Sequence, residues 1–315
     1  METIRYILVY LRLAVLLPVP VITRVASWVS SSMALKLEVV LIGWANRLFR
    51  PRIPIEPFLD RDAYYAYLDV DDFRTLGRKL GLRDEWVAGL AVLDVGCGHG
   101  KLTRRVRELG ATRAVGLDIA ASSIAYAHQE LERRPLSGVE YLEGSVYQLP
   151  FPDATFDAIV SQVVFEHLMD IPLALAELRR VLKPGGRFYF TIDSIRCRYG
   201  SHLGHYILVP WPLLFFSEAA LEIYWKRAWR ETLREHHLDE APDFFEYGMG
   251  LPSLNRVRMA EVDRMIVEAG FEIERDVAYA DEKPLVNHLP FLRRFPLLFE
   301  FIRGSKAYLL RKPSA

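Results

Sequence analysis

Residues 88–192 alternate between two patterns of hydrophobic and polar positions. Short runs of β-branched, aliphatic and aromatic residues are each followed by a longer run with apolar residues at helical spacing. Strands that alternate with helices of about 10–15 residues predict parallel βαβ units with right-handed crossovers. The predicted strands are Ala91–Val95, Ala114–Asp118, Val139–Glu143, Phe156–Ser161 and Arg187–Ile192. The predicted helices start at Lys101 and cover residues 121–134 and 166–182.

The first 50 residues are apolar in a different way. Residues 6–23 are mostly apolar, but Arg12, Pro18 and Pro20 interrupt them, and the prolines break or kink a helix near residue 17. The helix that remains is shorter than the hydrocarbon core of a membrane is thick. We therefore favour a segment that lies on the membrane surface, and a single transmembrane span is the alternative. Residues 285–302 repeat this composition with two further prolines, which predicts an interfacial or lid element.

Residues 33–50 predict an amphipathic helix. Such a helix either lies in the membrane interface or packs its apolar face on the protein's own core. Beside the first apolar segment, membrane association is the favoured interpretation. The basic face is expected to hold Lys36, Gly43, Arg47 and Arg50, opposite Leu37, Val40, Leu41, Trp44 and Leu48.

The composition is that of an ordinary globular protein, but the charged residues are unevenly distributed along the chain. The chain has 315 residues, 51% of them hydrophobic, with 40 basic and 40 acidic side chains. This excludes a disordered chain and argues against nucleic acid as a partner. Residues 1–56 and 281–315 each hold seven basic and three acidic side chains, which leaves 26 against 34 in residues 57–280. Two basic, apolar ends therefore flank an acidic body.

The two cysteines, Cys97 and Cys197, are too few for a disulfide framework and are not spaced as a metal site. We therefore expect a reducing compartment and no metal.

The sequence VLDVGCGHG at residues 92–100 leaves a predicted strand and opens a helix. Gly96, Gly98 and Gly100 let the backbone turn tightly and approach a ligand. The third glycine comes one residue earlier than in the G-x-G-x-x-G fingerprint of dinucleotide enzymes. Asp118 ends the second strand, where a carboxylate can accept both ribose hydroxyls or cap the next helix.

Residues 92–191 resemble the class I S-adenosylmethionine-dependent methyltransferases, in particular the group acting on small molecules and lipids. The resemblance rests on the glycine loop, Asp118 and the sequences LPFPDATFDAIV, FEHL and VLKPGGRF. It implies an α/β fold with a Rossmann-like seven-stranded sheet. Residues 256–279 and 306–311 are similar to the last helix and antiparallel hairpin of that fold.

The resemblance also implies a set of cofactor contacts. The three loop glycines would line the methionine and ribose parts of S-adenosylmethionine, and Asp94 would orient the loop near the cofactor's amino group. Asp118 would hold the ribose hydroxyls. Ile119 would pack on the adenine, and Gln162 would contact the methionine end.

The adenine contact departs from the family pattern. Family members usually carry an acidic residue after the glycine of E-G-D-A, whereas this chain has Glu143-Gly144-Ser145-Val146. The Ser145 hydroxyl and the backbone of Val146 are the expected readers of adenine.

His167, which with Glu166 is expected to begin the helix after the fourth strand, is the candidate catalytic base. A histidine of near-neutral pKa suits the deprotonation of a hydroxyl. The alternative is that Glu-His serves packing or cofactor orientation.

The chain is expected to divide into four parts. Residues 1–56 are membrane-associating helices, residues 57–193 the cofactor-binding core, and residues 194–255 a helical, aromatic-rich cap over the substrate. Residues 256–315 complete the fold and contain an apolar insertion at residues 284–304.

The expected function is methyl transfer to an apolar, lipid-linked or glycolipid acceptor on the cytoplasmic side of a membrane. Two alternatives stay open: an NAD-dependent oxidoreductase on a related sheet, and a non-catalytic, membrane-bound scaffold with a cofactor fold.

Overall fold

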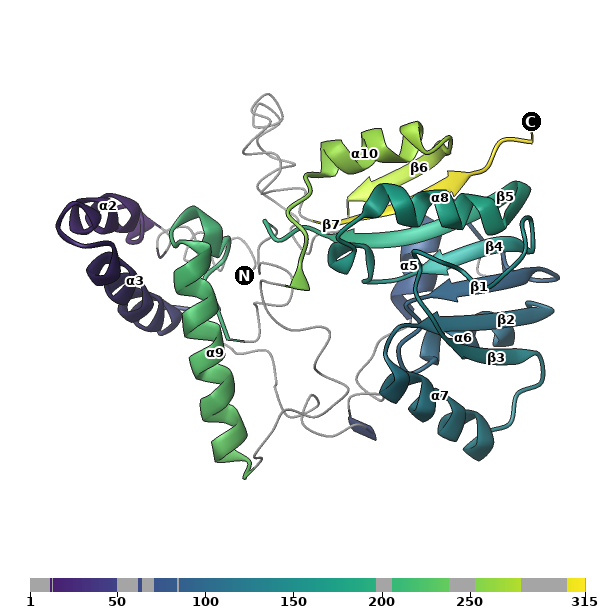
Figure 1. Ribbon diagram of the computed structural model, residues 1–315, viewed down its shortest axis with the longest axis horizontal. Coiled ribbons are helices and arrows are strands. Elements are labelled where there is room, and N and C mark those ends of the chain that lie inside the picture. Colours follow the sequence, from purple (N-terminus) through teal and green to yellow (C-terminus); the bar gives the residue numbers. More distant parts are fainter. Residues whose placement is uncertain are drawn as a thin grey trace, which may run out of the picture.

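A computed structural model gives the architecture shown in Figure 1. It describes residues 12, 14–49, 62–63, 71–83, 85–196, 206–237, 253–278 and 305–314. The predicted apolar insertion at residues 284–304 and Cys197 lie outside the described residues.

Seven strands form one sheet in the order β3-β2-β1-β4-β5-β7-β6. The first five strands run parallel, and β7 pairs antiparallel with both β5 and β6. The predicted α/β fold with a seven-stranded, Rossmann-like sheet is confirmed. The strands are β1 Ala91–Val95, β2 Arg113–Asp118, β3 Val139–Glu143, β4 Phe156–Ser161, β5 Leu182–Asp193, β6 Glu272–Ala278 and β7 Ser305–Arg311.

Alternate residues of the strands enter two hydrophobic cores, one on each face of the sheet. Leu93 and Ile159 pack with helices α8 (Ile171–Val181) and α10 (Met259–Glu268). Their neighbours Val92 and Ala158 face the other core, to which α5 (Asp71–Lys79) and α6 (Lys101–Glu108) contribute. Helix α7 (Ala121–Arg133) packs over β3. The period of two makes three layers, helix, sheet and helix.

The helix after β4 starts later than the sequence predicts. Phe165–His167 form a single 3-10 turn, and α8 begins only at Ile171. The side chain of Asp170 accepts a hydrogen bond from the backbone N–H of Leu173, and a proline occupies the first turn. This N-cap sets the start of the helix. His167 therefore lies on a turn that precedes the helix.

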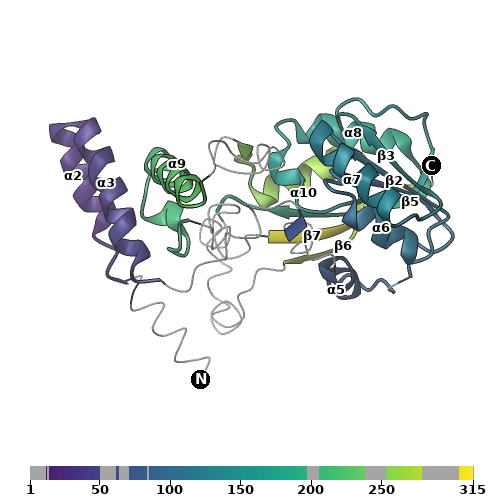
Figure 2. The ribbon, with the colours of Figure 1, turned by 90° about the horizontal axis from the view of Figure 1, so that it is seen from below.

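A further core lies away from the sheet. Helix α2 (Val19–Val29) and helix α3 (Ser31–Asn46) form a hairpin, and α3 contacts α9 (Glu218–Glu235) of the predicted cap. In Figures 1 and 2, α9 lies between this hairpin and the sheet. The core contains Leu16, Val19, Ile42, Ala45 and Phe49 of the N-terminal segment and Ile207, Val209, Phe215, Phe216, Leu221 and Trp225 of the cap.

Polar contacts fix the hairpin to the cap. The Asn46 side chain donates hydrogen bonds to the carbonyl of Tyr206, at 2.6 Å, and to the hydroxyl of Tyr224, at 3.1 Å. It also accepts one from the N–H of Leu208 at 2.9 Å. The carboxylate of Glu38 accepts from the N–H and the hydroxyl of Ser217, the N-cap residue of α9. The first helices and the cap segment therefore pack as one unit.

The prediction that α3 separates a basic face from an apolar face is wrong. Its outer surface carries Met33, Lys36, Val40, Trp44 and Arg47, which are all exposed and follow each other at steps of three or four residues. Helical spacing places them in one stripe, so cations and apolar side chains share the surface. The hairpin packs on α9 through other positions. No helix among the described residues is long and apolar enough to span a membrane.

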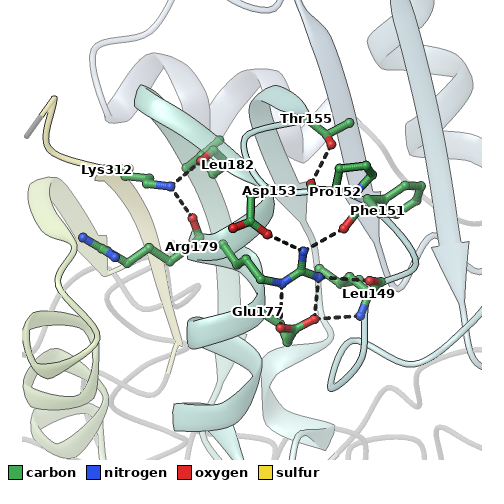
Figure 3. Close-up of polar contacts among 10 residues, drawn as sticks. Leu149, Phe151, Pro152, Asp153, Thr155, Glu177, Arg179, Leu182 and Lys312 are labelled. Carbon is green, nitrogen blue, oxygen red and sulfur yellow. Dashed lines mark hydrogen bonds and ion pairs between the residues drawn. The ribbon is translucent and has the colours of Figure 1, made fainter.

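Arg180 ties the loop before β4 to helix α8. Figure 3 labels its partners Leu149, Phe151, Asp153 and Glu177. Its guanidinium donates to both carboxylate oxygens of Glu177 and to Asp153. It also donates to the backbone carbonyls of Leu149 and Phe151, at 3.0 and 2.7 Å. The hydrogen bonds that Arg180 donates to Glu177 raise the pKa of Arg180 and lower the pKa of Glu177. Only the planar fork of an arginine reaches all of these acceptors.

We predict that Arg180→Lys lowers the free energy of unfolding by about 2 kcal/mol, because a lysine keeps the charge but leaves backbone carbonyls without their donor. Urea unfolding followed by circular dichroism measures this change. Arg105→Lys is the matched control, since Arg105 makes a single ion pair with Glu108 on an exposed helix surface. Equal losses in both variants would contradict the role of the fork.

Candidate functional site

The candidate site lies at the carboxyl edge of the parallel strands. The strand order reverses between β1 and β4, which is where open α/β sheets bind ligands. The hydroxyl of Ser161, at the end of β4, donates to the carbonyl of Val95, at the end of β1, at a distance of 2.9 Å. This bond holds the two strand ends together at the point of reversal.

The loop after β1 is built from glycines in the left-handed region. Gly96, Gly98 and Gly100 have φ angles of 70°, 50° and 77°. Val164 closes over Gly96 and Tyr141 over Gly100, so tightly that a Cβ at either glycine would clash. A Cβ on Gly98 would meet no atom within 4 Å. The backbone at Gly98 therefore borders open space, as a loop that approaches a ligand must.

Asp118 connects this loop to the end of β2. Its carboxylate accepts hydrogen bonds from the N–H of Gly98, at 2.7 Å, and from the N–H of Ala120, at 2.9 Å. The second bond belongs to the turn that leads into α7, so the helix-capping interpretation is also part of the geometry. A carboxylate oxygen accepts more than one hydrogen bond, which leaves capacity for ribose hydroxyls.

Asp94 lies beneath the loop and is 2% exposed. The hydroxyl of Thr103 donates to its carboxylate at 2.6 Å. Burial raises the pKa of Asp94 to about 7, and the nearby Asp118 carboxylate adds to the rise, while the Thr103 bond opposes it. Near neutral pH a cation placed in the adjoining space would favour the ionised form of Asp94.

The predicted adenine and methionine contacts flank the loop on neighbouring strands. Ile119 follows β2 directly and its side chain is 59% exposed, which suits packing on a flat ring. The Ser145 hydroxyl accepts from the N–H of Tyr147 at 3.2 Å. The side chain of Val146 is buried in the core, so only its backbone is available to a ligand. Gln162 is half-buried just after β4.

The chain after Gln162 is strained. Val163 has a φ of 57°, which a β-branched residue rarely adopts, and its N–H donates to the hydroxyl of Thr191 at 2.9 Å. This turn brings the side chain of Val164 against Gly96. The loop that carries Gln162 is thus bent toward the glycine loop.

His167 is held by the end of the predicted cap. Its Nδ1 lies 3.0 Å from the carbonyl of Ser253. A carbonyl only accepts, so Nδ1 carries the proton and Nε2 is left with a lone pair. Burial lowers the pKa of His167, so the ring is neutral near pH 7. These are the properties of a general base.

Asn255 fixes the turn on which His167 lies. Its side-chain amide donates to the carbonyls of Phe165 and Leu168, at 2.7 and 3.0 Å. Its backbone N–H donates to the carbonyl of Glu166 at 2.7 Å. Burial, aided by the charge of Asp193, raises the pKa of Glu166 well above its ordinary value.

Sequence reasoning missed the residues that support the site. Thr103 holds Asp94, Tyr141 donates its hydroxyl hydrogen to the carbonyl of Gly100, and Ser253 and Asn255 hold the His167 turn. Thr103 lies nine positions after Asp94, on the inward side of α6, which is a signal that helical spacing could have provided. The partners of His167 are more than 80 residues away in the sequence and carry no such signal.

The described residues fit S-adenosylmethionine. The cofactor has a ribose diol, a flat adenine ring and a methionine end with an ammonium group. The site offers the Asp118 carboxylate beside the open space at Gly98, the exposed Ile119 side chain directly after Asp118, and the buried Asp94 carboxylate at the end of β1.

Comparisons with known proteins agree with this fit. Residues 93–190 match the family described as "Methyltransferase domain". The chain is 35% identical over 152 residues to the fatty-acid O-methyltransferase of Mycolicibacterium smegmatis, which covers 47% of this chain and 52% of that protein. It is also 34% identical over 161 residues to a probable phthiotriol/phenolphthiotriol dimycocerosates methyltransferase of Mycobacterium ulcerans. That alignment covers 50% of this chain and 57% of the relative.

A third relative is the malonyl-[acyl-carrier protein] O-methyltransferase of Serratia marcescens. The two are 40% identical over 103 residues, or 33% of this chain and 38% of that protein. The chain thus spans 38–57% of the length of these curated relatives.

We predict that the free energy of unfolding of the wild-type protein falls as pH rises, and that Asp94→Asn abolishes this fall. The raised pKa means that folded protein keeps the Asp94 proton up to about pH 7, while the unfolded chain releases it near 3.8. Stability therefore falls by roughly 4 kcal/mol between these values, and the variant should lack that fall. Urea unfolding at several pH values measures it.

Asp157→Asn is the control with the opposite sign. Burial raises the pKa of Asp157, but hydrogen bonds from Lys183 and from the N–H of Ala91 outweigh burial and lower it. This variant should lose stability above about pH 4, where the wild-type carboxylate is ionised. A pH profile of Asp94→Asn that parallels the wild type would refute the assignment for Asp94.

The matched residues 93–190 contain β1 with its glycine loop, the carboxylate at the end of β2, and strands β3 to β5. Strand order, site geometry and the family match agree over this range. Over residues 93–190 the chain therefore matches the family described as "Methyltransferase domain", and the matched residues contain the glycine loop and the Asp118 carboxylate of the candidate site.

Proposed function

We propose that the protein transfers a methyl group from S-adenosylmethionine to an apolar, lipid-linked or glycolipid acceptor at a membrane surface. The open space at Gly98, whose N–H is bound by the Asp118 carboxylate, is the observation that carries the cofactor part of the proposal. The family match favours this cofactor over the dinucleotide of the oxidoreductase alternative.

The residues of the site act mainly by positioning. The bound cofactor supplies an electrophilic methyl group for in-line displacement, so the protein must align donor and acceptor and, for a hydroxyl, remove a proton. Asp118 would orient the ribose and Asp94 the cationic methionine end. His167, neutral and oriented through Nδ1 by the carbonyl of Ser253, would take the acceptor's proton.

Two observations support an apolar acceptor. The described cap segment is rich in aromatic side chains, with Tyr206 edge-on to Trp225 and Trp225 stacked on Trp229. The cap's end also holds His167 through Ser253, so cap and candidate base are connected. The names of the curated relatives specify a fatty acid, a malonyl-acyl carrier protein and dimycocerosates as the compounds acted upon.

The function is tested by incubating lipid extracts with purified protein and S-adenosylmethionine that carries a deuterated methyl group. Mass spectrometry should detect a lipid that gains the labelled methyl, in amounts that rise with time. An Asp118→Ala sample serves as the background. No labelled lipid, together with micromolar binding of S-adenosylhomocysteine, would redirect the proposal to a water-soluble acceptor. Absence of cofactor binding as well would favour a non-catalytic scaffold.

We predict that Asp118→Ala weakens binding of S-adenosylhomocysteine by about a hundredfold. The variant loses two charge-assisted hydrogen bonds to the ribose and the tie to Gly98. Isothermal titration calorimetry measures the affinity. Glu132→Gln removes an exposed carboxylate near the end of α7 and should bind like the wild type. Unchanged affinity in Asp118→Ala would exclude the ribose role.

We predict that His167→Ala lowers the rate of label incorporation by about a hundredfold while the affinity for S-adenosylhomocysteine stays within threefold. Because the pKa of His167 is lowered, the wild-type rate should stay level as pH falls through the ordinary histidine value of 6.5. A variant rate within threefold of the wild type would show that His167 is not the base, and would favour its packing role.

A further inference from the structure

The outer surface of the α2–α3 hairpin is unusually apolar for a surface. Among the described residues, fifteen large hydrophobic side chains are exposed, and seven of them lie between residues 15 and 44. They are Val15, Leu17, Val21, Ile22, Met33, Val40 and Trp44. Their concentration on α2, α3 and the turn before α2 marks an interaction surface, whereas scattered single residues would not.

The apolar side chains on this surface are exposed although the hairpin is well packed on its inner side. The inward positions Leu16, Val19 and Ile42 are at most 4% exposed and pack against the cap. Leu17, in the turn before α2, and Val21, on α2, are 68% and 64% exposed. One apolar side of the hairpin thus packs against the cap, and a second apolar side is not covered by the described residues.

Cations are interspersed among these side chains. From residue 12 to residue 49 the sequence has four of them, Arg12, Arg24, Lys36 and Arg47, and the structure shows all four exposed. Glu38 is the single carboxylate of this range, and it is bound to Ser217 of the cap. Four positive charges against one negative charge leave a net charge of +3, which complements an anionic surface.

We infer that the outer surface of the α2–α3 hairpin, formed by Leu17, Val21, Met33, Val40 and Trp44 with Arg24, Lys36 and Arg47, docks on an anionic lipid bilayer. The apolar side chains enter the interface between headgroups and acyl chains, and the cations contact the headgroups. The tryptophan lies in this stripe, at the depth that its amphipathic ring prefers. This inference deepens the proposed function by naming the surface that meets the lipid.

The charge of the remaining chain favours one orientation. Residues 57–280 sum to −8, from 26 basic and 34 acidic side chains, so an anionic bilayer repels the body that carries the sheet. Figures 1 and 2 show the hairpin and the sheet on opposite sides of α9. Docking through the hairpin therefore leaves the cap between the bilayer and the cofactor-binding edge.

A second copy of the chain fits the hairpin less well. A twofold interface brings the same surface of both copies together, so the cations of one hairpin would approach those of the other. Lipid headgroups of opposite charge carry no such penalty.

The test is sedimentation of the full-length protein with vesicles of equimolar phosphatidylglycerol and phosphatidylcholine. We expect binding that weakens as salt rises and is much lower with pure phosphatidylcholine. Leu17→Ser with Val40→Ser should reduce binding at least tenfold, and Lys36→Gln with Arg47→Gln should reduce it by about fivefold per charge.

Matched controls come from the sheet body. Val267→Ser replaces an equally exposed valine, 61% against 68% for Val40, in helix α10. Lys79→Gln with Arg83→Gln removes two exposed cations at and beyond the end of α5. These variants should bind vesicles like the wild type.

Three outcomes would overturn the inference: vesicle binding that the hairpin variants do not change, binding that all variants lose equally, or no vesicle binding together with a dimer that the hairpin variants dissociate. Size-exclusion chromatography with light scattering detects the dimer. Affinity for S-adenosylhomocysteine, measured on the same samples, keeps a failure of docking distinct from a failure of the proposed enzyme function.

Discussion

The hydrogen bonds that the Asp118 carboxylate accepts join the loop after β1 to the loop after β2 in the candidate site. One oxygen binds the N–H of Gly98 in the loop after β1, and the other binds the N–H of Ala120 at the start of the turn into α7. The two adjacent strand ends and the first turns of two helices are thereby fixed to one another. A ligand that reaches Asp118 meets a loop whose backbone is already in place, so little conformational entropy is lost on binding.

This arrangement depends on backbone conformations that few side chains allow. Left-handed angles at Gly96 and Gly100 coincide with close packing by Val164 and Tyr141, so both φ and the available space require glycine there. Gly98 is different, because its φ of 50° is combined with open space. Two glycines therefore shape the loop and the third leaves room beside it. Val163, just after β4, also has a left-handed φ, and this turn directs the next residue, Val164, against Gly96.

The sequence predicted the sheet well because its signals are local. Strands β1, β3 and β4 have the predicted bounds, since each is a short apolar run between turn residues. The glycine loop and Asp118 were also found from local spacing. The start of α8 was misplaced, because the apolar run through Phe165 and Leu168 continues into the helix while the Asp170 cap lies within it. The partners of His167 depend on a chain crossing that no local pattern encodes.

The prediction that α3 has separate basic and apolar faces failed for a physical reason. A helix with one partner shows one apolar face, and the prediction assumed that α3 was such a helix. In the structure Ile42 and Ala45 face the cap core, whereas Val40 and Trp44 point outward beside Lys36 and Arg47. Two apolar faces on one helix weaken the sequence periodicity, because apolar residues then occur at inward and outward positions alike. The spacing of apolar residues therefore could not separate the face of α3 that packs on the cap from the face that the described residues leave exposed.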